Sequence, residues 1–183
     1  MTRQSIALAP LGSVEERLLD SIALALWAVF GLPVERLNPA PDPVRAFDAK
    51  RGQYSSPLVL RHLQDHGARN TLRILGVIEK DLYIPMLSFV YGQAQVNGRL
   101  ALLSTARLRQ EFYGLPGRWE LTHSRAVKEA IHEVGHTFGL VHCGNALCPM
   151  SLSNSIVQVD RKLDALCDPC SRVIKESVRG ARL

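Results

Sequence analysis

The chain has 183 residues, of which 46% are hydrophobic and 21% charged, and its formal net charge is +5. This length allows one well-packed domain and is short for two, and the composition excludes a disordered chain. The basic residues are scattered rather than gathered in a stripe, so the excess charge indicates an ordinary solvated surface.

Residues 6–10 are predicted to form a short strand that is followed by a buried helix at residues 13–31. Ser13 and Glu16 have the spacing of a capping box, and Gly31 can end the helix. The apolar part of this helix is too short to span a membrane, and acidic residues precede it rather than the positive region of a secretory signal. We therefore expect no membrane association and a cytoplasmic protein.

A proline-rich connection at residues 38–43 is expected at the surface. Beyond it, the apolar pattern predicts a helix at residues 57–66 that ends at Gly67. A run of branched apolar residues at 71–78 is typical of a buried strand.

Two further strands are predicted at residues 87–93 and 99–105, joined by a hairpin turn with an Asn-Gly pair at its tip. A long helix is predicted at residues 122–140, and the tail at residues 159–179 is predicted to be helical with an interruption. The order of these elements predicts a mixed α/β (α+β) fold, in which helices back a twisted sheet.

The decisive segment begins at His132 and Glu133 and continues through His136 and Gly139 to His142. Histidines four apart on a helix project from the same face and can share one zinc ion. Gly139 can take the positive φ that ends the helix, so the chain can turn back and bring His142 to the same ion. Three imidazole ligands leave one coordination position open for water, which is typical of a catalytic zinc.

Glu133 directly follows the first of these histidines, where its carboxylate can reach that water. Zinc lowers the pKa of a bound water to about 7, so a carboxylate can accept its proton near neutral pH. Glu133 is therefore the candidate general base, and general acid toward the leaving amine, in peptide-bond hydrolysis. His62 and His66 are also four apart, but no acid follows the first of them, so we interpret them as a solvated helix face.

The four cysteines lie within the last 41 residues. Their clustering favours a metal site in a reducing compartment over a disulfide framework. The spacing of Cys143, Cys148, Cys167 and Cys170 predicts a closed, all-thiolate structural zinc site that fixes the C-terminal segment. We therefore predict two zinc ions per chain.

These segments together resemble the archaemetzincins, a family of metzincin zinc metallopeptidases. The likeness extends to Met150, which the resemblance identifies as a Met-turn residue that packs beneath the histidines without binding the metal. It implies a single metzincin-like domain over residues 1–183, with the sheet and active-site helix in residues 1–142. Residues 143–183 would form a small zinc-stapled subdomain. It also implies that an extended peptide lies along residues 87–93.

The expected function is a zinc-dependent metallopeptidase that acts on peptides or proteins, with aminopeptidase-like action as one form of it. One alternative is a gated or catalytically silent protein that binds through its zinc site. A nucleic-acid-binding zinc module ranks last, because few aromatic residues are interleaved with basic ones. The sequence does not identify substrate-binding residues or an oligomeric state.

Overall fold

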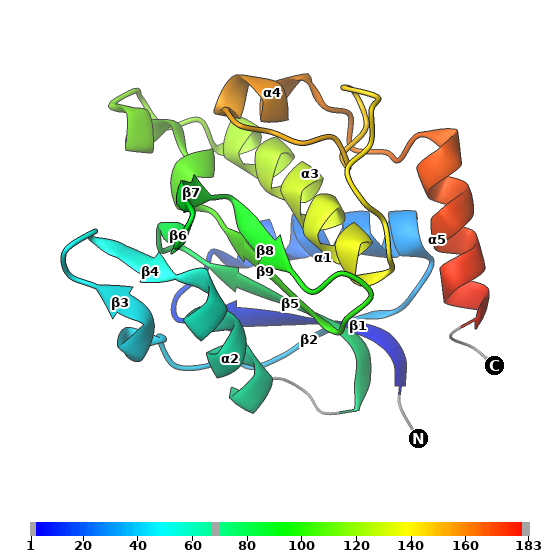
Figure 1. The fold of residues 1–183 in the computed structure, drawn as a ribbon, viewed down its shortest axis with the longest axis horizontal. Coiled ribbons are helices and arrows are strands. Elements are labelled where there is room, and N and C mark those ends of the chain that lie inside the picture. The colour runs from blue at the N-terminus through cyan, green and yellow to red at the C-terminus, as the bar shows by residue number, and fades with distance from the viewer. Residues whose placement is uncertain (1–2, 67–69, 181–183) are drawn as a thin grey trace.

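A computed structural model of the chain describes residues 3–66 and 70–180. At its centre is a five-stranded sheet in the order β2-β1-β5-β9-β8 (Figure 1). The first four of these strands are parallel, and β8 pairs antiparallel with β9 at the edge. The five strands are β1 (Arg3–Leu11), β2 (Val34–Arg36), β5 (Thr71–Ile78), β8 (Gly92–Ala94) and β9 (Leu100–Ser104).

A second, smaller sheet has the order β3-β4-β6-β7. It contains β3 (Phe47–Asp48), β4 (Gln53–Ser55), β6 (Leu82–Ile84) and β7 (Leu87–Val90). Both β7 and β8 are edge strands, and the single residue Tyr91 separates them. The chain therefore passes from the edge of one sheet to the edge of the other at this residue.

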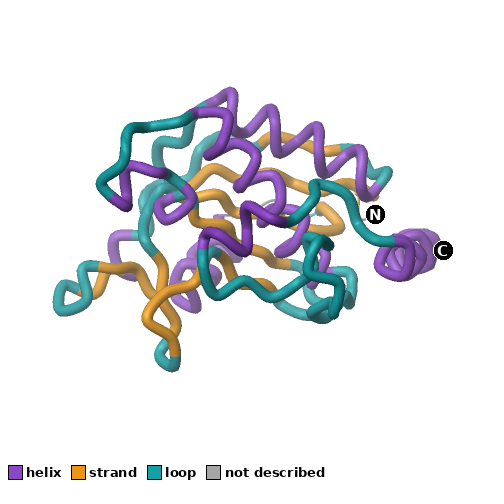
Figure 2. Tube along the Cα trace, turned by 90° about the horizontal axis from the view of Figure 1, so that it is seen from above, coloured by secondary structure: helices purple, strands orange, loops and turns teal. Residues whose placement is uncertain are grey.

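The described residues form five α-helices: α1 (Glu16–Phe30), α2 (Ser56–His66), α3 (Trp119–Thr137), α4 (Ile156–Arg161) and α5 (Asp168–Gly180). Three short 3₁₀ turns, η1 (Val44–Ala46), η2 (Ala106–Leu108) and η3 (Gln110–Tyr113), complete the described elements. Seen from above, the strands in the middle of the molecule lie between helical segments, and α5 stands at the edge of the molecule (Figure 2).

Alternate residues of the central strands enter two separate cores, because side chains alternate between the faces of a strand. Ile6 and Leu8 of β1 pack in a core with α1, α3 and α5, whereas Ala7 and Ala9 pack in a core with α2. The sheet is thus covered by helices on both faces, which confirms the predicted mixed α/β class. Among the described residues, no helix is both long and apolar enough to cross a membrane.

Most predicted elements are confirmed, including the strand at 71–78 and the hairpin, whose tip residue Asn97 has a φ of 55°. The prediction of a capping box at Ser13 and Glu16 is wrong. Helix α1 begins at Glu16 after the N-cap residue Glu15, and no side chain caps it. The reason is that Gly12, with a φ of 72°, turns the chain directly after β1, and its N–H donates to the Ala40 carbonyl. The predicted stop at Gly67 lies outside the described residues.

Two other expectations need correction in their bounds. The run 87–93 is divided into β7 and β8 rather than forming one strand. The long helix begins earlier, at Trp119, and ends earlier, at Thr137. The helical tail is interrupted as predicted, because α4 ends at Arg161 and α5 begins at Asp168.

Candidate active site

Helix α3 presents two histidines on one face, at the position where β8 approaches it. The Nε2 atoms of His132 and His136 lie 3.0 Å apart. On the opposite face, Ala130, Ile131 and Val134 are fully buried in the core with α1 and the sheet. Packing of this apolar stripe therefore fixes the rotation of α3 about its own axis. The two histidines face a cavity on the other side of the helix.

The third histidine reaches the same place because the chain reverses directly after the helix. Gly139 has a φ of 91°, and its N–H donates to the His136 carbonyl at 2.9 Å. After this turn, the His142 ring lies 5.4 Å from the His132 ring and 5.2 Å from the His136 ring, measured between centroids. The candidate ligand atoms of the three residues all lie within 4.8 Å of one another.

Hydrogen bonds orient two of these rings. Nδ1 of His132 donates to the Pro149 carbonyl at 2.8 Å, and Nδ1 of His136 donates to the Leu140 carbonyl at 2.7 Å. Because each Nδ1 carries a proton, each Nε2 presents a lone pair toward the other ring. Burial lowers the pKa of His132 well below its ordinary value and also lowers the pKa of His136. Both imidazoles are thus kept neutral, as metal ligands must be.

These distances fit a zinc ion. In a tetrahedral site with Zn–N bonds of about 2.0–2.1 Å, ligand nitrogens lie about 3.3 Å apart. The Nε2 atoms of His132 and His136, at 3.0 Å, are near this separation. His142 is exposed, so the site opens on one side to the cavity and to solvent.

Glu133 is buried beside this cluster, and its carboxylate rests against the backbone of β8. A Cβ atom added to Gly92 would lie 2.5 Å from Oε1 of Glu133 and would also meet the Leu102 carbonyl. Burial raises the pKa of Glu133 well above its ordinary value; the charge of Glu129 adds to this shift and Lys162 opposes it. A carboxylate with a raised pKa is a stronger proton acceptor.

A cavity of about 500 Å³ opens over the histidines and Glu133. Its lining includes β7, Tyr91 and β8, together with Leu152, Ser153 and Asn154 of the segment that follows Met150. Among the residues that the structure describes, no Lys or Arg lines it. The cavity therefore joins the candidate metal ligands, the carboxylate and two sheet edges in one space.

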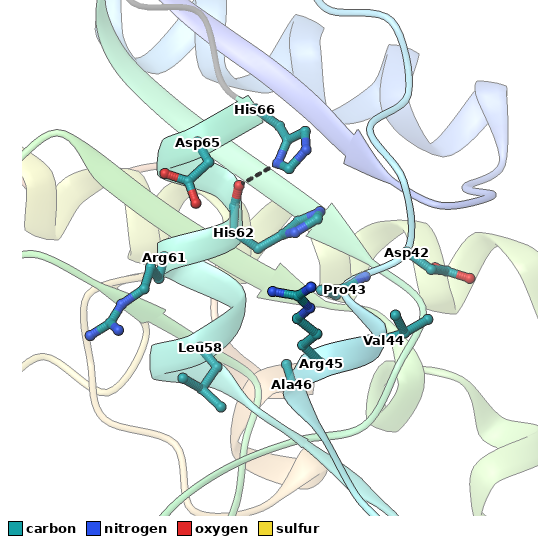
Figure 3. A pocket seen from close by; sticks show the side chains of 10 residues that line it. All are labelled: Asp42, Pro43, Val44, Arg45, Ala46, Leu58, Arg61, His62, Asp65 and His66. Carbon is teal, nitrogen blue, oxygen red and sulfur yellow. Dashed lines mark hydrogen bonds between the residues drawn. The ribbon is translucent and has the colours of Figure 1, made fainter.

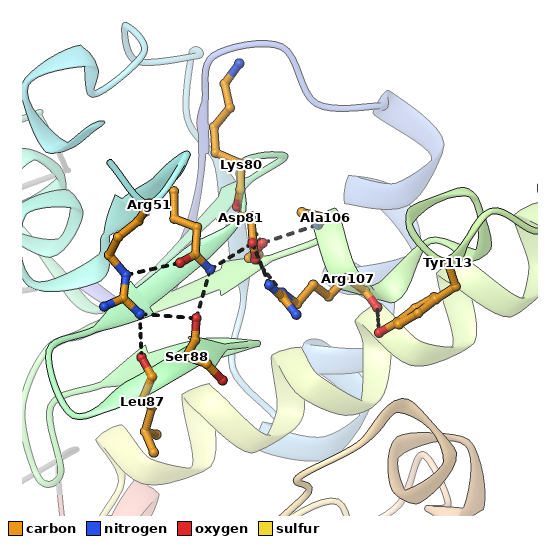
Figure 4. Close-up of polar contacts among 10 residues, drawn as sticks. Arg51, Lys80, Asp81, Leu87, Ser88, Ala106, Arg107 and Tyr113 are labelled. Carbon is orange, nitrogen blue, oxygen red and sulfur yellow. Dashed lines mark hydrogen bonds and ion pairs between the residues drawn. The ribbon is translucent and has the colours of Figure 1, made fainter. Parts of the chain in front are cut away.

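The β7 side of this cavity is held from behind by a polar network (Figure 4). Arg51 donates to the Leu87 carbonyl at 3.0 Å, and Gln53 donates to the Ser88 carbonyl at 2.9 Å. Gln53 also donates to Asp81, whose carboxylate receives two hydrogen bonds from Arg107, at 2.7 and 2.8 Å. These bonds fix the position of β7 although it is an edge strand.

Met150 is fully buried beneath the helix. Its sulfur lies so close to Gly135 that a Cβ there would meet it at 2.5 Å. The Met150 carbonyl receives a hydrogen bond from the Cys143 N–H at 2.9 Å, which closes the loop between them. Met150 therefore packs under the histidine-bearing turn without facing the cavity.

The four cysteines also meet. Their Sγ atoms all lie within 4.8 Å of one another, and those of Cys143 and Cys167 are 3.7 Å apart. All four are free thiols. Sulfur ligands of a tetrahedral zinc, with Zn–S bonds of about 2.3 Å, are about 3.8 Å apart. A hydrogen bond from the Cys170 N–H lowers the pKa of Cys167, which favours a thiolate at the start of α5.

The other histidines do not form such clusters. His62 and His66 lie beside a hollow of about 410 Å³ between α2 and η1 (Figure 3). Their ring nitrogens bond to the Pro41 and His62 carbonyls. His123 is buried beside Ser21, 3.1 Å from its hydroxyl. Within residues 3–66 and 70–180, the histidine and cysteine clusters are the two groups that could hold a metal.

Sequence reasoning included Tyr91 and Gly92 in the run expected to bind the peptide but gave them no role of their own, and it missed Ser153, Glu129 and the buried partner of Glu129, Lys162. For Gly92, a glycine inside a predicted strand was an available signal of close backbone approach. The others carry no local signal, because they meet the site only through the fold.

Comparison with known proteins places these features in a family. The profile of peptidase family M54 matches residues 40–176. An archaemetzincin of Methanocaldococcus jannaschii is 42% identical over 173 residues, which cover 93% of both chains. The crystal structure of an archaemetzincin from Methanopyrus kandleri has a TM-score of 0.86 at 34% identity, with 97% of this chain and 96% of that chain covered. A zinc-dependent peptidase from Methanocorpusculum labreanum has a TM-score of 0.82 at 32% identity, with coverage of 92% and 99%.

The contact between Gly92 and Glu133 generates a first prediction. Gly92→Ala should lower kcat/KM for peptide cleavage at least tenfold, about 1.4 kcal/mol of transition-state stabilisation, because the new methyl group meets both the Leu102 carbonyl of β9 and the Glu133 carboxylate and moves the carboxylate relative to β8. Zinc content should be unchanged, since the histidines are not touched. The measurement is cleavage of a fluorogenic peptide pool beside metal analysis.

Gly76→Ala is the matched control, because it adds the same methyl group to β5, where the side chains of Leu63 and Leu102 meet it. It should cost stability but keep the specific activity of the folded protein. Full activity in Gly92→Ala would contradict the packing of Glu133 against β8.

Proposed function

Because the chain belongs to peptidase family M54, the archaemetzincins, and is a zinc metallopeptidase, we propose that Glu133 is its general base. The observation that carries the proposal is the shared cavity, in which the buried carboxylate lies next to the histidine cluster. We further propose that His132, His136 and His142 hold the catalytic zinc.

The chain's own residues supply the proton transfers. A zinc ion bound to the three histidines would polarise the scissile carbonyl and lower the pKa of a water to about 7. Glu133 accepts a proton from the attacking water as the new C–O bond forms. It then delivers this proton to the amine nitrogen as the C–N bond breaks. Gly92 and the rest of β8 keep the carboxylate in place through both steps.

We propose a second, structural zinc in the cysteine cluster, with Cys143, Cys148, Cys167 and Cys170 as its ligands. The spacing of the sulfur atoms and the absence of a disulfide among them support this assignment. Four thiolates leave no open position, so this ion would fix α5 against the histidine-bearing turn. In the same scheme, Gly139 ends the helix and Met150 is the Met-turn residue.

The same cavity bears on the two alternative functions, a nucleic-acid-binding module and a gated binding protein. A nucleic-acid module is disfavoured, because the described residues that line the cavity include no Lys or Arg to bind phosphates. A gated binding protein would keep the zinc and the cavity but cleave no peptide. Cleavage products also separate internal cuts from aminopeptidase-like removal of terminal residues.

Glu133→Gln should lower kcat about 100- to 10,000-fold, because an amide cannot accept the proton. Zinc-loaded parent and variant are incubated with a diverse peptide library, and the products are read by mass spectrometry. Zinc content should be equal in both proteins.

Glu120→Gln provides the matched control, since it changes the same side chain on the same helix at an exposed position. It should cleave as the parent does. Equal cleavage by the Glu133 variant would refute the proposed base, and no cleavage by the zinc-filled parent would favour the gated protein.

Cys170→Ser should reduce the zinc content from two ions to one and lower Tm by about 6–12 °C, if losing one ligand costs about 3 kcal/mol. Metal analysis and thermal unfolding measure the two effects. Ser171→Ala, a neighbouring change on α5, should alter neither. A parent that contains one zinc, or a variant that retains two, would contradict the four-thiolate site.

A further inference from the structure

One apolar face of the cavity lining has no role in the chemistry described above. It consists of Leu87, Phe89 and Tyr91, which alternate along the chain and therefore point to the same side of the strand. Phe89 and Tyr91 pack with the core that contains α3, whereas Val90 between them packs with the core on the other side of the sheet. Leu87 is 52% exposed, Phe89 is half-buried and Tyr91 is 6% exposed. This apolar strand face thus leads from solvent into the protein.

The ring of Phe89, in the middle of this face, is held by its neighbours. The central guanidinium carbon of Arg107 lies 4.2 Å from the centroid of Phe89 and 4.6 Å from that of Phe112. Asp81 receives two hydrogen bonds from the same guanidinium, which fix its position and compensate its charge (Figure 4). The Tyr91 ring meets Phe89 edge to face, with centroids 5.2 Å apart. The accessible part of Phe89 is therefore a preformed apolar surface, which can bind a ligand without first being ordered.

The rest of the lining disfavours a charged substrate side chain. No Lys or Arg lines the cavity among the described residues, so an acidic group finds no counter-charge there. Glu129 also lines the cavity, but its Oε1 receives a hydrogen bond from Lys162 Nζ at 2.8 Å, and both side chains are buried. A basic group therefore finds this carboxylate already paired. A charged side chain that enters would lose its hydration with little compensation.

We propose that Phe89 is the specificity-determining residue of a subsite for an apolar substrate side chain of the size of Leu, Met or Phe. The inference rests on the proposed peptidase function of the same cavity. Such a side chain would remove its own apolar surface, and that of Phe89 and Leu87, from water. A polar side chain of the same size would lose its hydrogen bonds to water against this face without replacing them. The substrates are thus peptides with an apolar residue beside the bond that is cleaved.

The test measures binding rather than turnover. Amino-acid hydroxamates anchor on the zinc, and the side chain precedes the anchor in one series and follows it in the other. Each series contains the near-isosteric pair Leu and Asn, together with Phe, Lys and Glu members. Calorimetry on the zinc-loaded parent should give a Kd about 10- to 100-fold lower for the Leu member than for the Asn member in one series.

Phe89→Ala should reduce this ratio about fivefold, because it removes most of the apolar surface that the ligand covers. Phe89→Met, which keeps a large apolar side chain, should restore most of the ratio. Phe112→Ala is the matched control. It removes the other aromatic contact of Arg107, but Phe112 is 44% exposed and does not line the cavity. This variant should leave the ratio unchanged, and thermal unfolding shows that each variant is folded.

Three results on the parent would overturn the subsite even if Phe89→Ala does not fold: Leu-to-Asn ratios below about threefold in both series, tighter binding of the Lys or Glu member, or no binding of any hydroxamate. A ratio that Phe89→Ala leaves intact, or that Phe112→Ala lowers equally, would also overturn it. Peptide cleavage is scored separately. A chain that discriminates among the hydroxamates but cleaves no peptide would support the subsite and contradict the proposed mechanism. A chain that cleaves without discriminating would do the reverse.

Discussion

The burial of helix α3 is the constraint on which the rest of the structure depends. Thirteen of its 19 residues are buried, and several of them are charged or titratable, so each needs a partner inside the protein. Most partners of the polar side chains of α3 follow the helix in sequence: the carbonyls of Leu140, Pro149 and Val159, the Asp160 carboxylate and the Lys162 ammonium. The C-terminal segment lies over α3 (Figure 1) because it satisfies these groups.

What could be predicted from the sequence is the part of the site that is local. His132, Glu133 and His136 lie within two helical turns, and Gly139 returns His142 within three further residues. Their relative positions follow from helix geometry and one positive φ, both of which a sequence displays. The strand at 71–78 could be predicted for a similar reason, because a run of branched apolar residues is typical of a strand in a sheet that is covered on both faces.

The remainder depends on contacts between distant residues. Glu129 and Lys162 are 33 residues apart, and Gly92 meets a carboxylate 41 residues later in the chain. An apolar run such as 87–93 predicts extended backbone, but the change of sheet at Tyr91 is set by the partners of each half, β6 and β9. The predicted capping box was wrong for a related reason. The turn at Gly12, held by its hydrogen bond to the Ala40 carbonyl, occupies the positions at which the helix was expected to begin.

The two candidate metal clusters are joined through one loop. His142 and Cys143 are consecutive, and the Cys143 N–H bonds to the Met150 carbonyl. Pro149, the residue before Met150, accepts the hydrogen bond that orients His132. In the proposed zinc-filled state, Cys143 and Cys148 would close this loop from both ends, and so hold the Pro149 carbonyl where the ring requires it. The thiolate cluster would then act on catalysis through ring orientation, because a histidine ligand depends on the partner of its other nitrogen.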